Sequence, residues 1–250
     1  MTILFLDGLH AGAAAGPIIR QHGHTEAAAA EQAERLFDAL DAKLAEAGCT
    51  LHDVCKLTVE IGDRAYRQGV YSVLGRRLAG VFPVSTGLIV KGFFDPDVLV
   101  QLEVWVVRGG PHRRLRQYRS TDRAYGLNRQ GFVCDFCMAV VADGRVFLRG
   151  QTGGALTGPM VGLNDPGAQA TQAIDNVRVL LADAGADLTR AVKLVTYVTD
   201  RAYVRPVMDV VERVFDSAPV ASTTLIVKGL AAPELLMEID VHAVQIITPA

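Results

Sequence analysis

The chain has 250 residues, half of them hydrophobic and 21% charged, and its formal net charge is −2. This is the composition of a globular protein, and so small a charge gives no overall attraction to nucleic acid or to acidic lipid. No apolar stretch approaches the roughly 20 residues of a membrane-spanning helix. The apolar start MTILFLDG lacks a basic region and is interrupted by Asp7, which argues against a secretory signal. Four cysteines without such a signal indicate reduced thiols in the cytoplasm.

The opening segment 1–23 is too short to hold a β-hairpin followed by a long loop. A helix is expected over about 25–47, then a strand, a second helix and two strands that end near Val107. Segment 108–129 carries seven arginines and one acidic residue. Three interpretations stay open for it: a solvated linker, a segment that faces phosphate or carboxylate groups, and an RNA-binding segment. The last is the weakest, because no aromatic-rich strand is present to stack bases.

From residue 131 the pattern of elements is more complete. The apolar runs FVCDFCMAV and RVFLRG flank the turn Ala142-Asp143-Gly144, which predicts a β-hairpin. After a loop rich in glycine and proline, a helix is expected over about 168–184, because apolar residues recur at steps of three and four and Gly185 follows. A strand, a second helix and two closing strands give the order β-β-α-β-α-β-β. This order predicts an α+β domain, a mixed sheet with two helices on one face.

The two halves of the chain repeat each other at a spacing of 137 residues. STGLIVKG (85–92) matches STTLIVKG (222–229) at seven of eight positions, and KLTVEIGDRAY (56–66) matches KLVTYVTDRAY (193–203) at six of eleven. Gln32 falls on Gln169 at the same spacing. So long a period indicates a duplicated domain rather than a solenoid. We therefore expect a first copy over 1–108 with a truncated front, an Arg-rich linker over 109–130 and a complete second copy over 131–250.

Several motifs in the second copy resemble those of the Rid (YjgF-like) family of reactive-intermediate deaminases. In chain order they are CDFCMAV (134–140), VFLRGQ (146–151), KLVTYVTD (193–200), PVASTTLIV (219–227) and LLMEID (235–240). The resemblance covers essentially all of 131–247 and, in the first copy, about 25–107. It implies a chorismate-mutase-like fold in each copy, assembly into trimeric rings with sites at the seams between domains, and hydrolysis of imines or enamines with no metal or organic cofactor.

The sequence departs from the family pattern at several positions of the site. The family arginine falls on Ser222, and on Ser85 in the first copy, while the family tyrosine falls on Phe136. Three further residues replace those of the family pattern: Cys137 stands in place of a serine, Met208 in place of a helix asparagine, and Arg149 in place of another serine. In the first copy, Tyr71 stands at the place that matches Met208. These departures argue against standard 2-aminoacrylate deamination.

Two charged residues are the candidates for catalysis. Arg149 precedes Gly150 and would restore the lost positive charge for a substrate carboxylate. Glu238 keeps the family glutamate and would handle water, whereas the first copy has Gln101 there. The predicted substrate-binding residues are Phe136, Cys137, Gly150, Gln151, Ser222 and Met208. Arg149 as an ion-pair partner and Glu238 as an interface carboxylate stay open as structural alternatives.

Cys134 and Cys137 have the spacing of a metal or redox pair. On a strand, residues three apart point to opposite faces, and no second pair accompanies them, so neither zinc nor a disulfide is expected. The predicted function is hydrolysis of a small carboxylated imine, enamine or amide-like metabolite by a cytoplasmic homotrimer, without a membrane partner. A non-catalytic ligand-binding member of the family and, less favoured, an RNA-directed protein are the alternatives.

Overall fold

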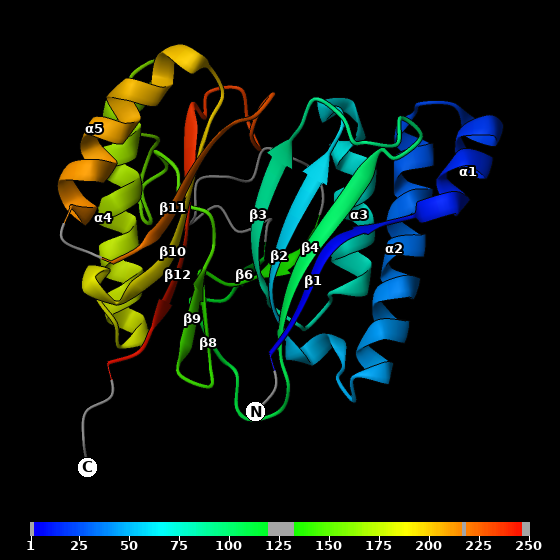
Figure 1. Cartoon of the computed structure of the whole chain (residues 1–250), viewed down its shortest axis with the longest axis horizontal. Coiled ribbons are helices and arrows are strands. Elements are labelled where there is room, and N and C mark those ends of the chain that lie inside the picture. Colours follow the sequence, from blue (N-terminus) through cyan, green and yellow to red (C-terminus); the bar gives the residue numbers. More distant parts are fainter. Residues whose placement is uncertain (1–2, 120–132, 217–218, 247–250) are drawn as a thin grey trace.

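The structure, a computed structural model, describes residues 3–119, 133–216 and 219–246. It contains two main β-sheets that face each other, and the helices cover their outer sides (Figure 1). Each sheet mixes parallel and antiparallel pairs. The predicted α+β fold, with helices on one face of each of two similar sheets, is therefore confirmed.

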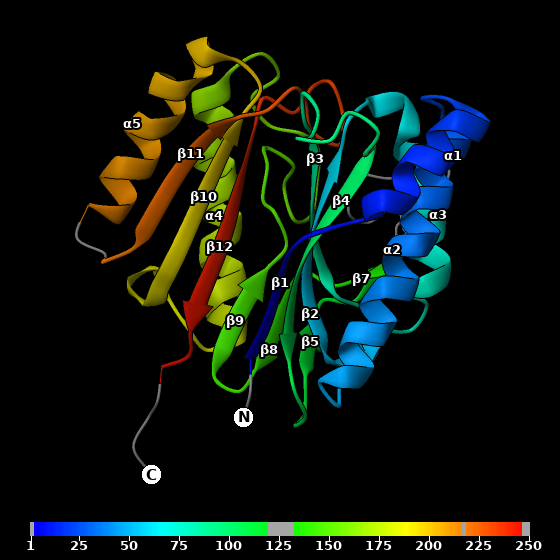
Figure 2. The same ribbon diagram turned by 45° about the vertical axis from the view of Figure 1, so that its right-hand side comes forward.

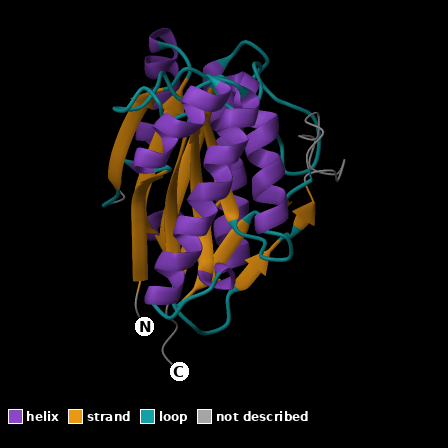
Figure 3. Cartoon of the chain, turned by 90° about the vertical axis from the view of Figure 1, so that its right-hand side faces the viewer, coloured by secondary structure: helices purple, strands orange, loops and turns teal. Residues whose placement is uncertain are grey.

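The first copy forms a four-stranded sheet in the order β1-β4-β2-β3. The strands are β1 (Ile3–His10), β2 (Val54–Ile61), β3 (Val84–Ile89) and β4 (Val100–Val107), and the helices are α1 (Ala15–His22), α2 (Glu26–Glu46) and α3 (Arg67–Arg77). The helices lie in front of the sheet when the molecule is seen from this side (Figure 3). The single strand β1 pairs with β4 where the second copy has the hairpin of β8 and β9.

The second copy forms a six-stranded sheet in the order β11-β10-β12-β9-β8-β5. The strands are β5 (Arg113–Leu115), β8 (Ala139–Ala142), β9 (Arg145–Leu148), β10 (Ala191–Val198), β11 (Ala221–Ile226) and β12 (Met237–Val244), and the helices are α4 (Pro166–Ala184) and α5 (Val204–Phe215). A small separate sheet joins β6 (Tyr118–Arg119) to β7 (Asp135–Phe136). The predicted order of the second copy is confirmed, although its first apolar run is broken into β7 and β8 by a bend at Met138.

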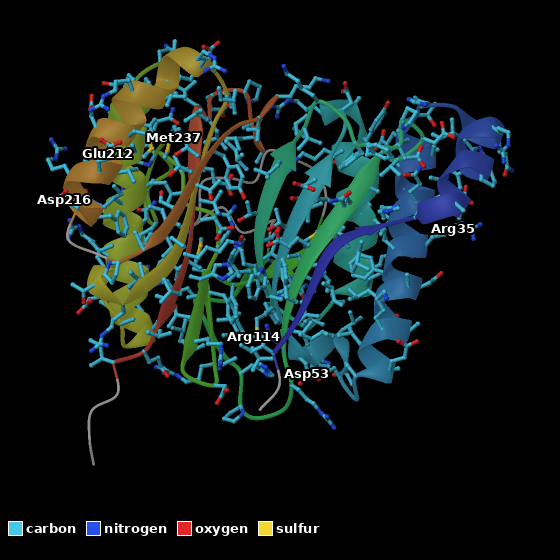
Figure 4. The ribbon with its side chains drawn as sticks, viewed as in Figure 1. Arg35, Asp53, Arg114, Glu212, Asp216 and Met237 are labelled. Atoms are coloured by element: carbon cyan, nitrogen blue, oxygen red, sulfur yellow. The ribbon has the colours of Figure 1, made fainter. Side chains whose placement is uncertain are left out.

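Part of the predicted linker belongs to the second sheet. Strand β5 pairs with β8, and Arg114 in it donates hydrogen bonds to the carbonyl oxygens of His52, Val54 and Phe82 in the first copy. Arg114 thus lies between the two sheets (Figure 4). The domain boundaries themselves stay a prediction. The RNA-directed interpretation depended on the Arg-rich segment 108–129, of which residues 120–129 lie outside the described residues.

The repeated glutamine, Gln32 in the first copy and Gln169 in the second, is buried and has the same structural role in both copies. The Gln32 side chain donates to the Asp97 carbonyl and accepts from the Leu99 amide, both at 2.8 Å. The Gln169 side chain makes the same two bonds, to the residues 137 positions further on, at 2.9 Å. A buried amide costs free energy unless both its groups are paired, and here each copy pairs both. The glutamine therefore ties the helix to the same connection in both copies.

The repeated octapeptide forms equivalent strands in different surroundings. It contains most of β3 in the first copy and most of β11 in the second, each parallel to the strand that precedes it in its sheet. Leu88 and Ile89 of β3 are each 2% exposed, whereas Leu225 and Ile226 of β11 are 46% and 43% exposed. The difference arises because β3 lies at the seam with the second copy, while the same side of β11 is open (Figure 2). None of the described helices is long and apolar enough to cross a bilayer.

Candidate functional site

Glu238 lies on β12 at the seam between the copies. Alternation along the strand places it on the same face as Asp240 and His242. Glu238 is 5% exposed, and its carboxyl packs against the backbone of Gly150, where any Cβ atom would overlap Oε1. A glycine is therefore required at position 150 for Glu238 to occupy this place.

The surroundings of Glu238 change its acidity. Burial raises the pKa of Glu238 to about 7; Arg149, Lys56 and Arg67 oppose the rise, and Asp240 adds to it. Within the described part of the chain, no hydrogen bond or ion pair satisfies the Glu238 carboxyl. A buried carboxyl that titrates near neutrality and lacks a protein partner is suited to exchange protons with a bound molecule.

Arg149 lies one residue past the end of β9 and beside Gly150. Its backbone is fixed by Gln151, whose side-chain amide donates to the Arg149 carbonyl at 2.7 Å and whose backbone pairs with Ile239 of β12. The Arg149 guanidinium lies 5.8 Å from the centre of the Tyr118 ring, a cation–π contact. No described carboxylate lies within 4 Å of this guanidinium, so the alternative of an ion pair at the seam gains no support among the described residues.

The first copy contributes a second arginine that sequence reasoning missed. The Arg67 guanidinium, at the start of α3, stacks 4.1 Å from the centre of the Tyr71 ring. The Tyr71 hydroxyl in turn packs against Gly87 of β3, where a Cβ atom would overlap it. Burial lowers the pKa of Arg67, Tyr71 opposes this, and the charges of Arg149 and Arg64 lower it further.

A buried ion pair joins the copies next to Glu238. Lys56 Nζ of β2 lies 2.9 Å from Asp240 Oδ2, 3.1 Å from Thr86 Oγ1 and 3.0 Å from the Leu148 carbonyl. Burial alone would raise the pKa of Asp240, but Lys56 and His242 outweigh it and hold that pKa below its usual value. Asp240 is therefore a carboxylate already neutralised by Lys56, which leaves Glu238 as the acid of the two whose pKa lies near neutrality.

The predicted site residues divide into two groups by their position. Phe136 lies on β7 beside Tyr118, and Gly150 and Gln151 lie next to Arg149. Cys137 is fully buried nearby, and its thiol donates to the carbonyl oxygens of Phe82 and Ala139. Burial raises the pKa of Cys137 to about 12, although Arg114 opposes the rise, which argues against a thiolate nucleophile. The four cysteines are free and buried.

The other two predicted residues lie away from this cluster. Ser222 is exposed on β11, separated from β12 by the whole of β10. Met208 lies on α5, where its sulfur accepts a hydrogen bond from Thr224. Their first-copy equivalents, Ser85 and Tyr71, occupy the seam instead: the Ser85 carbonyl accepts from the Gly150 amide, and the Tyr71 carbonyl accepts from the Cys134 thiol.

The first copy has no acidic residue at the position that corresponds to Glu238. Gln101 occupies the position of Glu238, and its amide donates to Glu60 at 3.3 Å. Glu60 falls on Tyr197, which pairs with Glu238 across β10 and β12. The first copy thus lacks the isolated acid, and the described residues contain a single cluster of this kind. No group of three or more potential metal ligands occurs among the residues that the structure describes.

Comparison with known proteins extends this description. The family model "Endoribonuclease L-PSP" matches residues 130–245. A structure of a chorismatase aligns with 88% of this chain and 72% of its own, at a TM-score of 0.68 and 17% identity, which shows a shared fold. A YjgF-family protein from Mycobacterium tuberculosis is 28% identical, over 54% of this chain and 99% of its own, with a TM-score of 0.41. A Rid-family protein from Yersinia pestis is 25% identical, over 44% and 86%, with a TM-score of 0.38. No curated protein sequence matches significantly.

Proposed function

Because the chain belongs to the Rid (YjgF, L-PSP) family through its C-terminal half, we propose that it is a hydrolase of small carboxylated imines or enamines. The observation that carries this proposal is the Glu238 carboxyl, which is buried, titrates near pH 7 and has no protein partner within the described residues. Arg149 stands beside it with a guanidinium that faces no described carboxylate. The pair offers a proton-transfer group and an anchor for a substrate carboxylate.

The reaction follows from these two groups. Arg149 holds the substrate carboxylate, in the two-pronged geometry that a guanidinium favours. Glu238, as its carboxylate, takes a proton from a water molecule whose oxygen bonds to the imine carbon. The same carboxyl returns that proton to the nitrogen of the tetrahedral adduct. The hydroxyl proton then passes through the Glu238 carboxylate to the same nitrogen, the carbon–nitrogen bond breaks, and ammonia leaves as the carbonyl group of the product forms.

The test is release of ammonia from imines generated in situ, 2-iminopropanoate and 2-iminosuccinate. The protein should accelerate release over the spontaneous rate, and Glu238→Gln should remove the acceleration while keeping the shape of the side chain. A protein that binds such acids without accelerating their hydrolysis would instead be a non-catalytic ligand-binding member of the family. That result would overturn the proposed function.

We also propose that the chain forms a homo-oligomer, with the trimer favoured over the dimer. Apolar side chains are exposed on β11, at Leu225 and Ile226, and on β1, where Ile3 is 37% and Phe5 is 43% exposed. The residues equivalent to those of β11 are buried by the second copy in the intramolecular seam, so a further copy of the chain would cover them in the same way. A stable 27 kDa monomer by light scattering at micromolar concentration would rule this out.

A further inference from the structure

The segment that links the two copies contributes a residue to the candidate site. Tyr118 lies on β6, outside both predicted copies, and the spacing of 137 residues gives it no equivalent in a chain of 250 residues. Tyr118 is 8% exposed, and the Arg149 guanidinium lies over its ring, 5.8 Å from the ring centre. This distance is within the range of a cation–π contact. A residue of the linker therefore contacts the side chain that we propose as the anchor for a substrate carboxylate.

Backbone hydrogen bonds also join the linker to Arg149. The Arg149 amide donates to the Met138 carbonyl at 2.9 Å, and the Met138 amide donates to the Leu115 carbonyl of β5 at 3.0 Å. Three residues after Leu115, Tyr118 pairs with Phe136 across β6 and β7. The linker thus supports Arg149 twice, through its backbone by way of Met138 and through the ring over which its guanidinium lies.

The two-stranded sheet that carries Tyr118 is tied to the first copy. Arg119 Nε, next to Tyr118, lies 3.0 Å from Asp135 Oδ1, and Asp135 Oδ2 accepts a hydrogen bond from the Gly80 amide at 3.0 Å. The rings of Tyr118 and Phe136 pack with their centres 6.3 Å apart. Tyr118 is therefore a buried ring on a short strand that is fixed at both edges, which suits it to hold another side chain in one direction.

The contact leaves Arg149 able to bind an anion. A cation–π contact stabilises the charge of a guanidinium without a carboxylate, so the planar fork can still receive the carboxylate of a ligand. Burial raises the pKa of Tyr118 to about 12, although Arg149 opposes the rise, so the phenol is neutral at physiological pH. Tyr118 therefore does not compete with an acidic ligand for the positive charge of Arg149.

We propose that Tyr118 is a positioning residue for the proposed reaction: its ring holds the Arg149 guanidinium in the direction from which it binds the substrate carboxylate. This role rests on the proposed function for the identity of the ligand. The aromatic ring performs it, so a phenylalanine at position 118 replaces the tyrosine. Because Tyr118 acts through Arg149 and not through Glu238, its loss affects binding of the substrate and not proton transfer.

The first experiment measures kcat and KM for 2-iminopropanoate by ammonia release. Tyr118→Leu removes the ring and should raise KM by about five- to tenfold, the worth of a desolvated cation–π contact, with kcat changed by less than about twofold. Tyr118→Phe should keep the wild-type KM. The control is Arg116→Gln on the same linker, whose guanidinium pairs with Asp183 at 2.6 Å and which should also keep the wild-type KM. A fall in kcat at unchanged KM in Tyr118→Leu would overturn the proposal.

Calorimetric binding of unreactive propanoate separates this inference from the proposed function. Tyr118→Leu should bind propanoate about five- to tenfold more weakly than the wild-type protein, and the double variant with Arg149→Ala should bind no more weakly than Arg149→Ala alone. This pattern without any hydrolysis would overturn the hydrolase and support the role of Tyr118. Hydrolysis with equal binding by Tyr118→Leu and the wild-type protein, or additive losses in the double variant, would overturn the role of Tyr118 and leave the hydrolase intact.

A measurement on the wild-type protein tests the contact even if Tyr118→Leu does not fold. The Nε–H proton resonance of Arg149, identified by its absence from the spectrum of Arg149→Lys, should be shifted upfield by the ring current of Tyr118. The shift should persist in Tyr118→Phe. A resonance at the position of an exposed arginine would show that the ring does not hold the guanidinium, and would overturn the proposal.

Discussion

The Glu238 carboxyl lies directly against the Cα atom of Gly150, on the side where any other residue would place its Cβ atom. The contact joins β12 to the turn that carries Arg149, so the proposed acid and the proposed anchor are positioned by the same glycine. It also means that the place of Glu238 can be disturbed without changing Glu238 itself.

Gly150→Ala should displace the Glu238 carboxyl and lower ammonia release by at least about tenfold, because misplacement of a catalytic group by about 1 Å costs large factors in rate. Loss of stability of about 1–3 kcal/mol should accompany it, from overpacking in a buried site. The control is Gly167→Ala, in the first turn of α4, where the nearest atoms lie 3.5 Å away. That variant should keep full activity, and equal activity in both variants would show that the contact does not position Glu238.

The raised pKa of Glu238 should make the free energy of unfolding depend on pH. Its pKa is about 7 when folded and about 4.5 otherwise, so the folded state binds more protons between these values. Stability should therefore fall as pH rises through this window, by about 3 kcal/mol at most. Urea unfolding at pH 5 and pH 8 should show the fall in the wild-type protein and lose most of it in Glu238→Gln. Glu212→Gln, on the exposed side of α5, should behave as the wild-type protein does.

The rate of ammonia release should also depend on the titration of Glu238, but it should rise with pH where the stability falls. If Glu238 acts as a base, kcat/KM for ammonia release should rise as pH increases through about 7, where the carboxylate forms. Glu238→Gln should lower turnover with little change in binding and should lose this part of the pH profile. Gln101→Glu, at the equivalent position of the first copy, should change little. A wild-type profile that is flat between pH 6 and pH 8 would contradict the assignment.

Arg149 should contribute to binding through its geometry as well as its charge. Arg149→Lys keeps the charge and loses the planar fork, so it should weaken binding of a substrate analogue severalfold. Arg149→Ala should weaken it by about ten- to hundredfold. Titration calorimetry with the unreactive acids succinate and propanoate measures the affinity of both variants. Binding by Arg149→Ala at wild-type affinity would show that the anchor lies elsewhere.

The ion pair between Lys56 and Asp240 should matter for stability, and the repeat supplies a matched control. Lys56→Met leaves a buried carboxylate without its partner and should cost about 3–5 kcal/mol in the free energy of unfolding. Lys193 is the equivalent lysine, but it is 36% exposed and lies 3.7 Å from Glu103. Lys193→Met should therefore cost less than about 1 kcal/mol. Similar losses in the two variants, by urea unfolding, would argue against a buried role for Lys56.

The sequence was sufficient to predict much of the fold but only part of the site. The order of elements in the second copy followed from turn residues, glycine stops and apolar periodicity, which are local signals. Glu238 and Arg149 stood out because they differ from their first-copy equivalents or from the family pattern. The position of Arg67 could not be predicted in this way, because a repeat shows that two copies are alike and does not show which face of one meets which face of the other. For the same reason the sequence does not show which of the two equivalent serines, Ser85 or Ser222, lies at the seam beside Gly150.

One signal in the sequence did mark the seam. The repeated octapeptide differs at a single position, Gly87 in the first copy and Thr224 in the second. Gly87 leaves room for the Tyr71 hydroxyl, whereas Thr224 donates a hydrogen bond to the sulfur of Met208. Since Tyr71 and Met208 are equivalent in the repeat, the two pairs have changed together. A mismatch inside an otherwise constant strand thus pointed to the helix residue that packs on it.

This pairing gives the last prediction, a double-mutant cycle at Gly87 and Tyr71. Gly87→Thr alone should destabilise the protein by about 1–3 kcal/mol, because its side chain overlaps the Tyr71 hydroxyl. Adding Tyr71→Met should recover most of that loss, since the pair then matches the one in the second copy, and the coupling should exceed about 1 kcal/mol. The double variant also removes the ring on which the Arg67 guanidinium stacks at 4.1 Å, so the recovery measures packing without that cation–π contact. Strictly additive losses in urea unfolding would show that the two positions do not share one packing arrangement.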